Sequence, residues 1–183
     1  SFIMENQSAY AYEDYSKKEG RWELIKGKFF DMSPAPTNKH QWITQKIAFM
    51  FEQELEDCEL CQVFISPIDW KISNDTVVQP DVAIFCNKEE FFADYFTKAP
   101  TLIVEVLSKS TALKDKNLKY SLYEKQGVQY YIIVEPDYEI ADIFVLKQDK
   151  YEKIKTVAKD DEFDFEIRDC KLKAQFDRVF KFE

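Results

Sequence analysis

The sequence predicts an α/β (α+β) domain in which helices flank a mixed central sheet. Two stretches with helical periodicity alternate with short apolar, β-branched and aromatic runs that are typical of strands. The 183 residues suit one domain with a single core over residues 1–183, and neither an internal repeat nor a linker divides them. A hydrophobic fraction of 45% with only 3 glycines argues against a loop-rich repeat protein.

The N-terminal third predicts a short helix, a hairpin and one long helix. Residues 12–18 suit a helix that ends at Gly20, and the runs 22–25 and 28–31 flank Lys26-Gly27 as a hairpin does. Thr37 or Asn38 can cap a helix that extends to about Asp57. That helix is indicated by apolar residues at helical spacing, namely Ile43, Ile47, Met50, Phe51 and Leu55.

The rest of the chain supplies the sheet and a second helix. We expect strands at residues 61–65, 68–72, 82–85, 101–107 and 130–134, and a hairpin formed by residues 140–146 and 151–157. Ser108, Ser110 or Thr111 can cap a helix that ends at Gly127. Residues 87–99 predict a short helix or an ordered loop with exposed aromatics, and the tail after Asp160 predicts irregular structure.

The four cysteines carry little functional information. Cys58-Glu59-Leu60-Cys61 is a C-x-x-C motif, but a structural zinc site needs four ligands and the only histidine is His40. A redox motif of this kind follows a strand and precedes a helix, whereas a helix is expected to end here. Because the cysteine content is too low for a disulfide framework, we expect reduced thiols in a cytoplasmic protein.

Charge and hydropathy limit the classes of partner. The formal charge of −9 argues against a protein that coats nucleic acid, since affinity for phosphates comes from clustered Lys and Arg. Residues 109–125 nevertheless carry five lysines against Asp115 and Glu124, and a solvated helix surface is the simpler explanation of this basic face. No apolar run approaches the roughly 20 residues of a membrane span, so no membrane partner is expected.

Two acids in strand-like segments are the strongest candidates for a functional site. Asp81 opens an apolar strand, and Glu105 lies inside the next one with apolar residues on both faces. An unpaired buried carboxylate costs several kcal/mol, so these acids predict a shared partner such as Mg²⁺ or Mn²⁺. The alternatives are that Pro80-Asp81 starts a turn and that Glu105 is a structural acid paired with a lysine or backbone amides.

Lys119 could complete such a site, whereas Glu23 and His40 have simpler structural explanations. Lys119 shares a helix face with Asp115 and Tyr123, and an ammonium group near two carboxylates can orient a water and stabilise charge on a phosphate. An ordinary surface ion pair between Asp115 and Lys119 is the simpler explanation. Glu23 favours an outward-facing position in its strand, and His40 favours a capping or packing role.

Several motifs occur in an order that resembles a known family. They are Glu23-Leu24-Ile25-x-Gly27, Met32-Ser33-Pro34, Gln79-Pro80-Asp81-Val82, Val104-Glu105-Val106-Leu107-Ser108, Ser110-Thr111, Asp115, Lys119, Tyr123 and Gly127-Val128. In these residues the chain resembles the Uma-two family of restriction-endonuclease-like proteins, within the PD-(D/E)xK nuclease superfamily. The resemblance extends from about Tyr12 to Pro136, and its specificity comes from the order and spacing of loose motifs.

The resemblance implies a restriction-endonuclease-like fold with a four-residue site. Asp81 matches the motif aspartate, and Glu105 matches the acid of the (D/E)xK element. Leu107 stands where the lysine of that element is expected, and Lys119 matches the family lysine that acts from the following helix. Glu23 matches the N-terminal acid of the family.

The leading hypothesis is a Mg²⁺-dependent endonuclease that hydrolyses phosphodiester bonds in DNA. Asp81 and Glu105 would hold Mg²⁺ or Mn²⁺, Lys119 would position and help to deprotonate the attacking water, and Glu23 would bind a second metal or a water. The basic stretch 109–125 would meet phosphates, and two-ended cleavage of a duplex would favour a homodimer. The alternative is a catalytically inactive nuclease fold that binds a partner or oligomerises.

Overall fold

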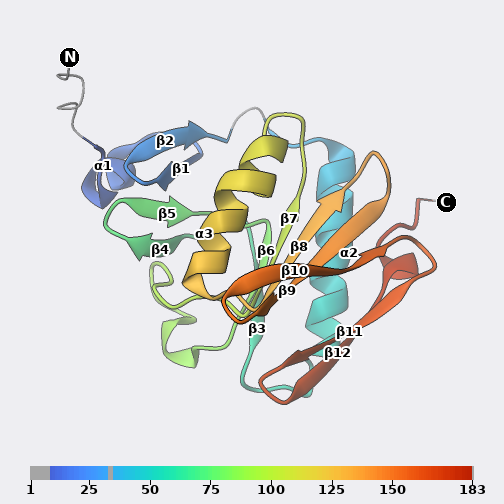
Figure 1. The fold of residues 1–183 in the computed structure, drawn as a ribbon. Coiled ribbons are helices and arrows are strands. Elements are labelled where there is room, and N and C mark those ends of the chain that lie inside the picture. The colour runs from blue at the N-terminus through green and yellow to red at the C-terminus, as the bar shows by residue number, and fades with distance from the viewer. Residues whose placement is uncertain (1–8, 33–34, 183) are drawn as a thin grey trace.

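The computed structural model describes residues 9–32 and 35–182, and a six-stranded mixed sheet lies at its centre (Figure 1). Its strands are β3 (Gln62–Ile65), β6 (Val82–Phe85), β7 (Leu102–Val106), β8 (Tyr130–Glu135), β9 (Ile140–Lys147) and β10 (Lys150–Val157). Their order is β10-β9-β8-β7-β6-β3, with β7 and β8 parallel and every other pair of neighbours antiparallel. The predicted mixed sheet is confirmed.

Helices cover both faces of this sheet. On one face, α2 (Asn38–Glu54) packs its apolar residues against Leu102, Val104 and Val106 of β7. On the other face, α3 (Lys119–Gln126) packs Leu122 and Tyr123 with Ile103. A π-helical turn, η3 (Lys114–Leu118), leads into α3, which ends where Gly127 adopts φ +80°. Glu105 therefore lies in a central strand covered on both sides.

The predicted capping of the long helix is confirmed in detail. Thr37 Oγ1 accepts a hydrogen bond from the backbone N–H of His40 at 3.1 Å, which satisfies one of the unpaired donors of the first turn. This contact fixes the start of α2 and therefore the position of the His40 side chain.

A second, four-stranded sheet in the order β2-β1-β5-β4 lies next to the central one (Figure 1). It contains β1 (Trp22–Ile25), β2 (Lys28–Asp31), β4 (Trp70–Ser73) and β5 (Thr76–Val78), and α1 (Tyr12–Lys17) precedes it. The predicted hairpin β1–β2 is confirmed, whereas β5 was missed because it has only three residues. This sheet places Glu23 of β1 inside the molecule, since Glu23 is fully buried.

The prediction of an irregular tail is wrong. Residues after Asp160 form a hairpin of β11 (Glu162–Ile167) and β12 (Cys170–Gln175), followed by the 3-10 turn η4 (Phe176–Arg178). Alternate side chains of the hairpin are buried in the core under α2, namely Phe165, Ile167, Leu172 and Ala174. The period-two alternation of Glu162–Ile167 was the available signal.

The segment 87–99 combines the two predicted alternatives and corrects one detail. A short 3-10 turn, η2 (Lys88–Glu90), precedes an ordered loop. Phe92 is fully exposed, as expected, but Phe96 is buried and stacks on Phe85 with ring centroids 3.7 Å apart. The loop therefore contributes Phe96 to the core, and Phe92 remains exposed.

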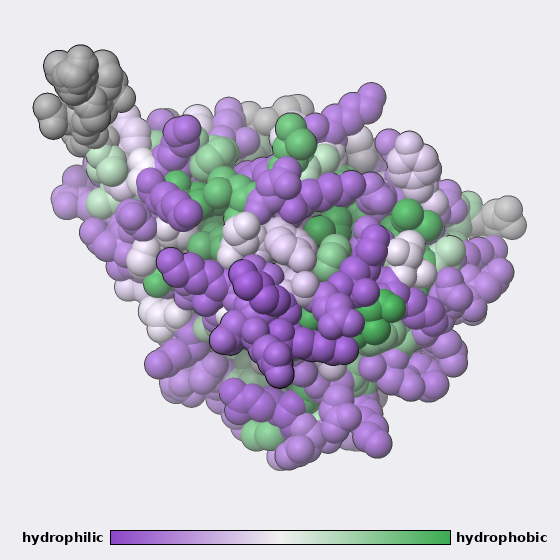
Figure 2. Space-filling view, viewed as in Figure 1, coloured by the Kyte–Doolittle hydropathy of each residue, from purple (hydrophilic) through white to green (hydrophobic). Residues whose placement is uncertain are grey.

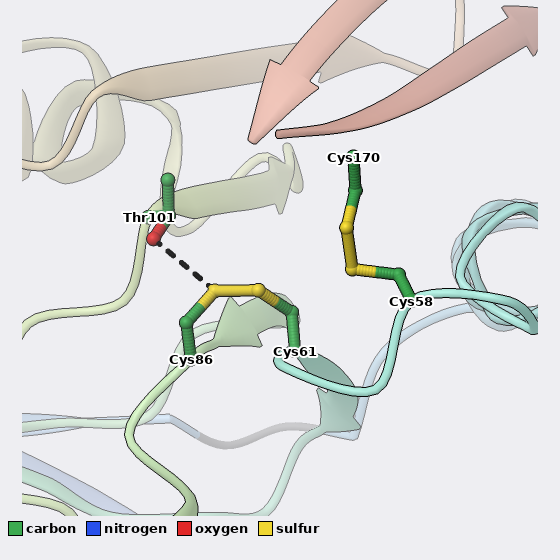
Figure 3. The surroundings of a disulfide bond; sticks show 5 residues. All are labelled: Cys58, Cys61, Cys86, Thr101 and Cys170. Atoms are coloured by element: carbon green, nitrogen blue, oxygen red, sulfur yellow. Dashed lines mark hydrogen bonds between the residues drawn. A yellow bond between two sulfur atoms is a disulfide. The ribbon is translucent and has the colours of Figure 1, made fainter. Parts of the chain in front are cut away.

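The expectation of reduced thiols is also wrong in the structure. Cys58 bonds to Cys170 and Cys61 bonds to Cys86, so each cysteine of the C-x-x-C motif pairs outside it (Figure 3). Cys61 and Cys86 flank the register pair Gln62–Phe85 of β3 and β6, which brings them opposite each other. Neither cysteine is left to ligate zinc or to form a C-x-x-C redox pair.

Two further expectations concern the Met32-Ser33-Pro34 motif and the membrane. The motif residues Ser33 and Pro34 lie outside the described residues. Among residues 9–32 and 35–182, no helix has both the length and the apolar character needed to cross a membrane.

Candidate active site

A pocket of about 580 Å³ opens where the start of α2, the end of β7 and the π-helical turn meet. Asp81, just before β6, and Glu105, in the neighbouring strand β7, both line it. The backbone N–H of Asp81 donates to Glu105 Oε1 at 3.1 Å, and the N–H of Val106 donates to Asp81 Oδ2 at 2.8 Å. The sheet thus holds the two predicted carboxylates side by side.

Lys119 is buried between two carboxylates. Its Nζ lies 2.7 Å from Glu105 Oε2 and 2.6 Å from Glu23 Oε2, and Tyr123 Oη donates to the same Glu105 oxygen at 2.8 Å. Burial alone would lower the pKa of Lys119, but the carboxylates, with Glu105 first, outweigh it and raise the pKa well above its ordinary value. The lysine therefore remains an ammonium group and a hydrogen-bond donor.

Glu23 accepts hydrogen bonds from two lysines, Lys114 and Lys119. Its Oε1 accepts from Lys114 Nζ at 2.8 Å, and its Oε2 accepts from Lys119 Nζ and from the backbone N–H of Gln79 at 2.7 Å. Burial would raise the pKa of Glu23, but Lys119 and Lys114 hold it below its ordinary value. The outward-facing interpretation is wrong, and Glu23 is not among the described residues that line the pocket.

Asp115 lines the pocket, although the predicted four-residue site does not include it. It lies in the π-helical turn, is only 3% exposed, lines the pocket and has Oδ1 4.0 Å from Lys119 Nζ. Burial raises the pKa of Asp115 to about 7, against the opposing effect of Lys119. The i, i+4 spacing to Lys119 was the available signal, but the pair is buried and is no surface ion pair.

His40 also reaches the site from the first turn of α2. Its Nε2 lies 3.5 Å from Asp81 Oδ2, and the ring lines the pocket. Burial would lower the pKa of His40, but the contact with Asp81 and further hydrogen bonds raise it. The predicted capping or packing role is therefore incomplete, because the imidazole also contacts a site carboxylate.

Comparison with known proteins identifies the family. Residues 9–167 match a family model named Uma2 and described as "Putative restriction endonuclease". The chain belongs to the Uma2 family. The family resemblance seen in the sequence is thereby confirmed, and the family description supports a nuclease.

Two relatives and one solved structure are also similar to this chain. The chain is 26% identical over 136 residues to the uncharacterised Synechocystis protein sll1609, with 72% of each chain covered. It is 29% identical over 128 residues to slr1290 of the same organism, covering 67% of this chain and 66% of the relative. A crystal structure described as "a putative nuclease belonging to DUF820", from Anabaena variabilis, superposes with a TM-score of 0.69. At 18% identity, over 84% of this chain and 87% of that one, it shows the shared fold.

The basic stretch of this Uma2 protein does not form one basic face. Lys114 and Lys119 point inward to Glu23, and Lys116 pairs with Glu135 at 2.9 Å. The side of the molecule that carries α3 is largely hydrophilic (Figure 2). The predicted phosphate-binding stretch is thus corrected, since two of its five lysines are committed to the buried site.

The charges of the site fit a divalent cation. Four carboxylates, of Glu23, Asp81, Glu105 and Asp115, face only two ammonium groups, of Lys114 and Lys119, with His40 beside Asp81. Burial and the neighbouring acids Asp115, Asp81 and Glu23 raise the pKa of Glu105 well above its ordinary value, despite Lys119. The described residues hold no trio of acids, histidines or cysteines spaced to bind a metal. Mg²⁺ is commonly held by one or two carboxylates together with water and substrate phosphate, so a carboxylate pair suits it.

The raised pKa of Asp115 predicts a pH-dependent stability. Between its unfolded pKa near 4 and its folded pKa of about 7, folded Asp115 keeps a proton that the unfolded chain has lost. Stability should therefore decrease as the pH rises from about 4 to 7. In Asp115→Asn this part of the slope should disappear, as measured by urea unfolding without metal at pH 4.5, 6.0, 7.0 and 8.0. An unchanged slope in the variant would contradict the assignment.

Proposed function

We propose that this Uma2 protein is a Mg²⁺-dependent endonuclease that hydrolyses phosphodiester bonds in DNA. The observation that carries the proposal is Lys119, held between two buried carboxylates at a pocket that Asp81 and Glu105 also line. A buried acid–lysine group of this kind, next to an open pocket, is typical of a catalytic site. The PD-(D/E)xK resemblance supports the same assignment, with the lysine supplied by α3.

Asp81 and Glu105 would hold the metal. Asp81 keeps 16% of its side chain exposed and faces the pocket, whereas Glu105 is nearly enclosed. When bound, Mg²⁺ would supply Lewis-acid stabilisation of the charge that develops on the phosphate in the transition state.

In the sequence-based hypothesis, Lys119 both positions and helps to deprotonate the attacking water. We propose that Lys119 positions the water and that Asp115 accepts its proton. Because its raised pKa keeps Lys119 protonated, it cannot readily accept a proton. Two of its three N–H groups face Glu23 and Glu105, and the third can be donated to the attacking water or to a phosphate oxygen. Asp115 faces the same pocket with a pKa of about 7, which suits a general base at neutral pH. We therefore assign the water's proton to Asp115.

Glu23 and Tyr123 act as positioning residues in this proposal. Three donors hold the carboxylate of Glu23 in place, and, unlike Glu105, Glu23 is not among the described residues that line the pocket. Tyr123 donates to the Glu105 oxygen that also receives Lys119, so it fixes the rotamer of Glu105. We propose this supporting role for Glu23 in place of a second metal or a water ligand.

A cleavage assay tests the proposal directly. Supercoiled, linear duplex and single-stranded DNA are incubated with Mg²⁺ or Mn²⁺, and at least one form should be cut by the wild-type protein. Asp81→Asn should show no detectable cleavage, because the carboxylate charge that attracts the metal is lost. The control Asp164→Asn, an exposed acid of β11, should cut at the wild-type rate.

Metal binding is measured separately from activity. Titration with Mn²⁺ should raise the melting temperature of the wild-type protein by mass action, with about 2.7 kcal/mol of stabilisation at 100 times the dissociation constant. Asp81→Asn should lose most of this stabilisation. No cleavage of any DNA form, together with no Mn²⁺ shift at millimolar concentration, would support the inactive nuclease fold instead.

A further inference from the structure

A second groove of about 650 Å³ continues from the candidate active site. It lies between one face of α2 and the edge strand β3, and it shares Arg21, Pro36, His40 and Asp81 with the first pocket. Because these four residues line both spaces, a ligand that extends past Asp81 would enter the groove.

The groove combines polar side chains with exposed apolar ones. The polar residues of α2 that line the groove after His40 are Gln41, Thr44, Gln45 and, at its far end, the acid Glu52. Farther along, Phe49 is 58% exposed and Ile65 of β3 is 53% exposed, although large apolar side chains are usually buried. Exposed apolar groups rimmed by polar ones are typical of a binding surface.

A cation lies where the two spaces meet. Arg21 is exposed, donates from Nη2 to Ser66 Oγ at 2.9 Å, and lines both the pocket and the groove. Guanidinium groups suit phosphate because their donors match its oxygens. Arg21 is therefore placed to contact a phosphate group of a ligand that extends from the pocket into the groove.

Together these features match the chemistry of unpaired nucleotides. Aromatic faces such as Phe49 stack on bases, and the amides of Gln41 and Gln45 can pair with base edges, while Arg21 meets the phosphate. In a continuous duplex the faces of the bases are already stacked on one another, so they cannot stack on a side chain. A second protein copy would explain the apolar residues, but it would not explain the cation at the junction with the active-site pocket.

We propose that this groove binds unpaired nucleotides next to the phosphate that is cleaved, so that the substrate is DNA with a single-stranded segment. The inference rests on the proposed function, because it takes the first pocket as the position of that phosphate. It adds the substrate class, which the carboxylates and Lys119 leave open.

The test is binding without catalysis. A fluorescein-labelled 12-nucleotide single strand and the matching blunt duplex are titrated with protein in EDTA, and fluorescence anisotropy is measured. Phe49→Ala should weaken binding of the single strand about tenfold, as expected from the loss of one stacking contact, and should change duplex binding less than about twofold. The control Phe92→Ala, at a fully exposed aromatic outside the groove, should leave both affinities unchanged.

The outcomes separate the groove from the catalytic proposal. The groove assignment is overturned if Phe49→Ala binds the single strand as the wild type does, or loses both affinities equally. It is also overturned if sedimentation shows a dimer that Phe49→Ala dissociates without changing DNA affinity. The two proposals can also fail separately. If the wild-type protein cuts no DNA but Phe49→Ala still weakens single-strand binding, the proposed nuclease is contradicted and the groove assignment is supported.

Discussion

Lys119→Met should destabilise the protein by about 3–5 kcal/mol, because it leaves two buried carboxylates without their shared cation. Glu23 and Glu105 both lie within 2.7 Å of the ammonium group, and all three side chains are almost completely buried. The variant should also lose about 10²–10³-fold in cleavage rate, since a donor that stabilises charge in the transition state is missing. Urea unfolding and a single-turnover cleavage assay measure the two effects.

The pH dependence of the variant identifies the cause of its instability. Without the ammonium group, the pKa of Glu105 should rise further and that of Glu23 should rise from its lowered wild-type position, so the folded variant should keep more protons above about pH 4 than the folded wild type does. The variant should therefore lose stability more steeply than the wild type as the pH rises from about 4. Lys116→Met is the matched control, because Lys116 forms a half-exposed pair with Glu135 and should change stability by less than about 1 kcal/mol. Equal losses in the two variants would contradict the buried-cluster explanation.

Loss of the Cys58–Cys170 disulfide should cost about 2–5 kcal/mol of unfolding free energy. The bond links the turn after α2 to the start of β12, at a sequence separation of 112 residues. A crosslink over so long a segment removes much conformational freedom from the unfolded chain. Cys58→Ala/Cys170→Ala, compared with wild type in urea with and without dithiothreitol, measures the effect.

The second disulfide supplies the comparison. Cys61–Cys86 spans only 25 residues, so Cys61→Ala/Cys86→Ala should be less destabilising by about 1 kcal/mol in the chain-entropy account. Dithiothreitol should lower the stability of the wild type more than that of either double variant, because it reduces two disulfides in the wild type and only one in each variant. Detection of four free thiols in the unfolded, unreduced protein would contradict both pairings.

Local patterns were enough to predict most of the fold. Several elements depend only on residues close together in the chain, so they can be recognised from the sequence. They are the Thr37 cap, the apolar spacing of α2, and the strands around Glu105 and at residues 130–134. The alternation in β11 is equally local, although it lies in a charged segment. Three-residue β5 carried too few residues for a period, and the cysteine pairings depend on which strands become neighbours.

The sequence by itself determined that a buried acid of a central strand needs a partner, and family motifs pointed to Asp81, Glu105, Lys119 and Glu23. Only the tertiary structure decided how they act together. It placed Glu23 behind Lys119, brought Asp115 and His40 to the pocket, and turned Lys114 inward. The physical reason is that burial and electrostatic interactions depend on distances through space between residues far apart in the chain. Local sequence patterns describe only the direction in which each side chain leaves its own strand or helix.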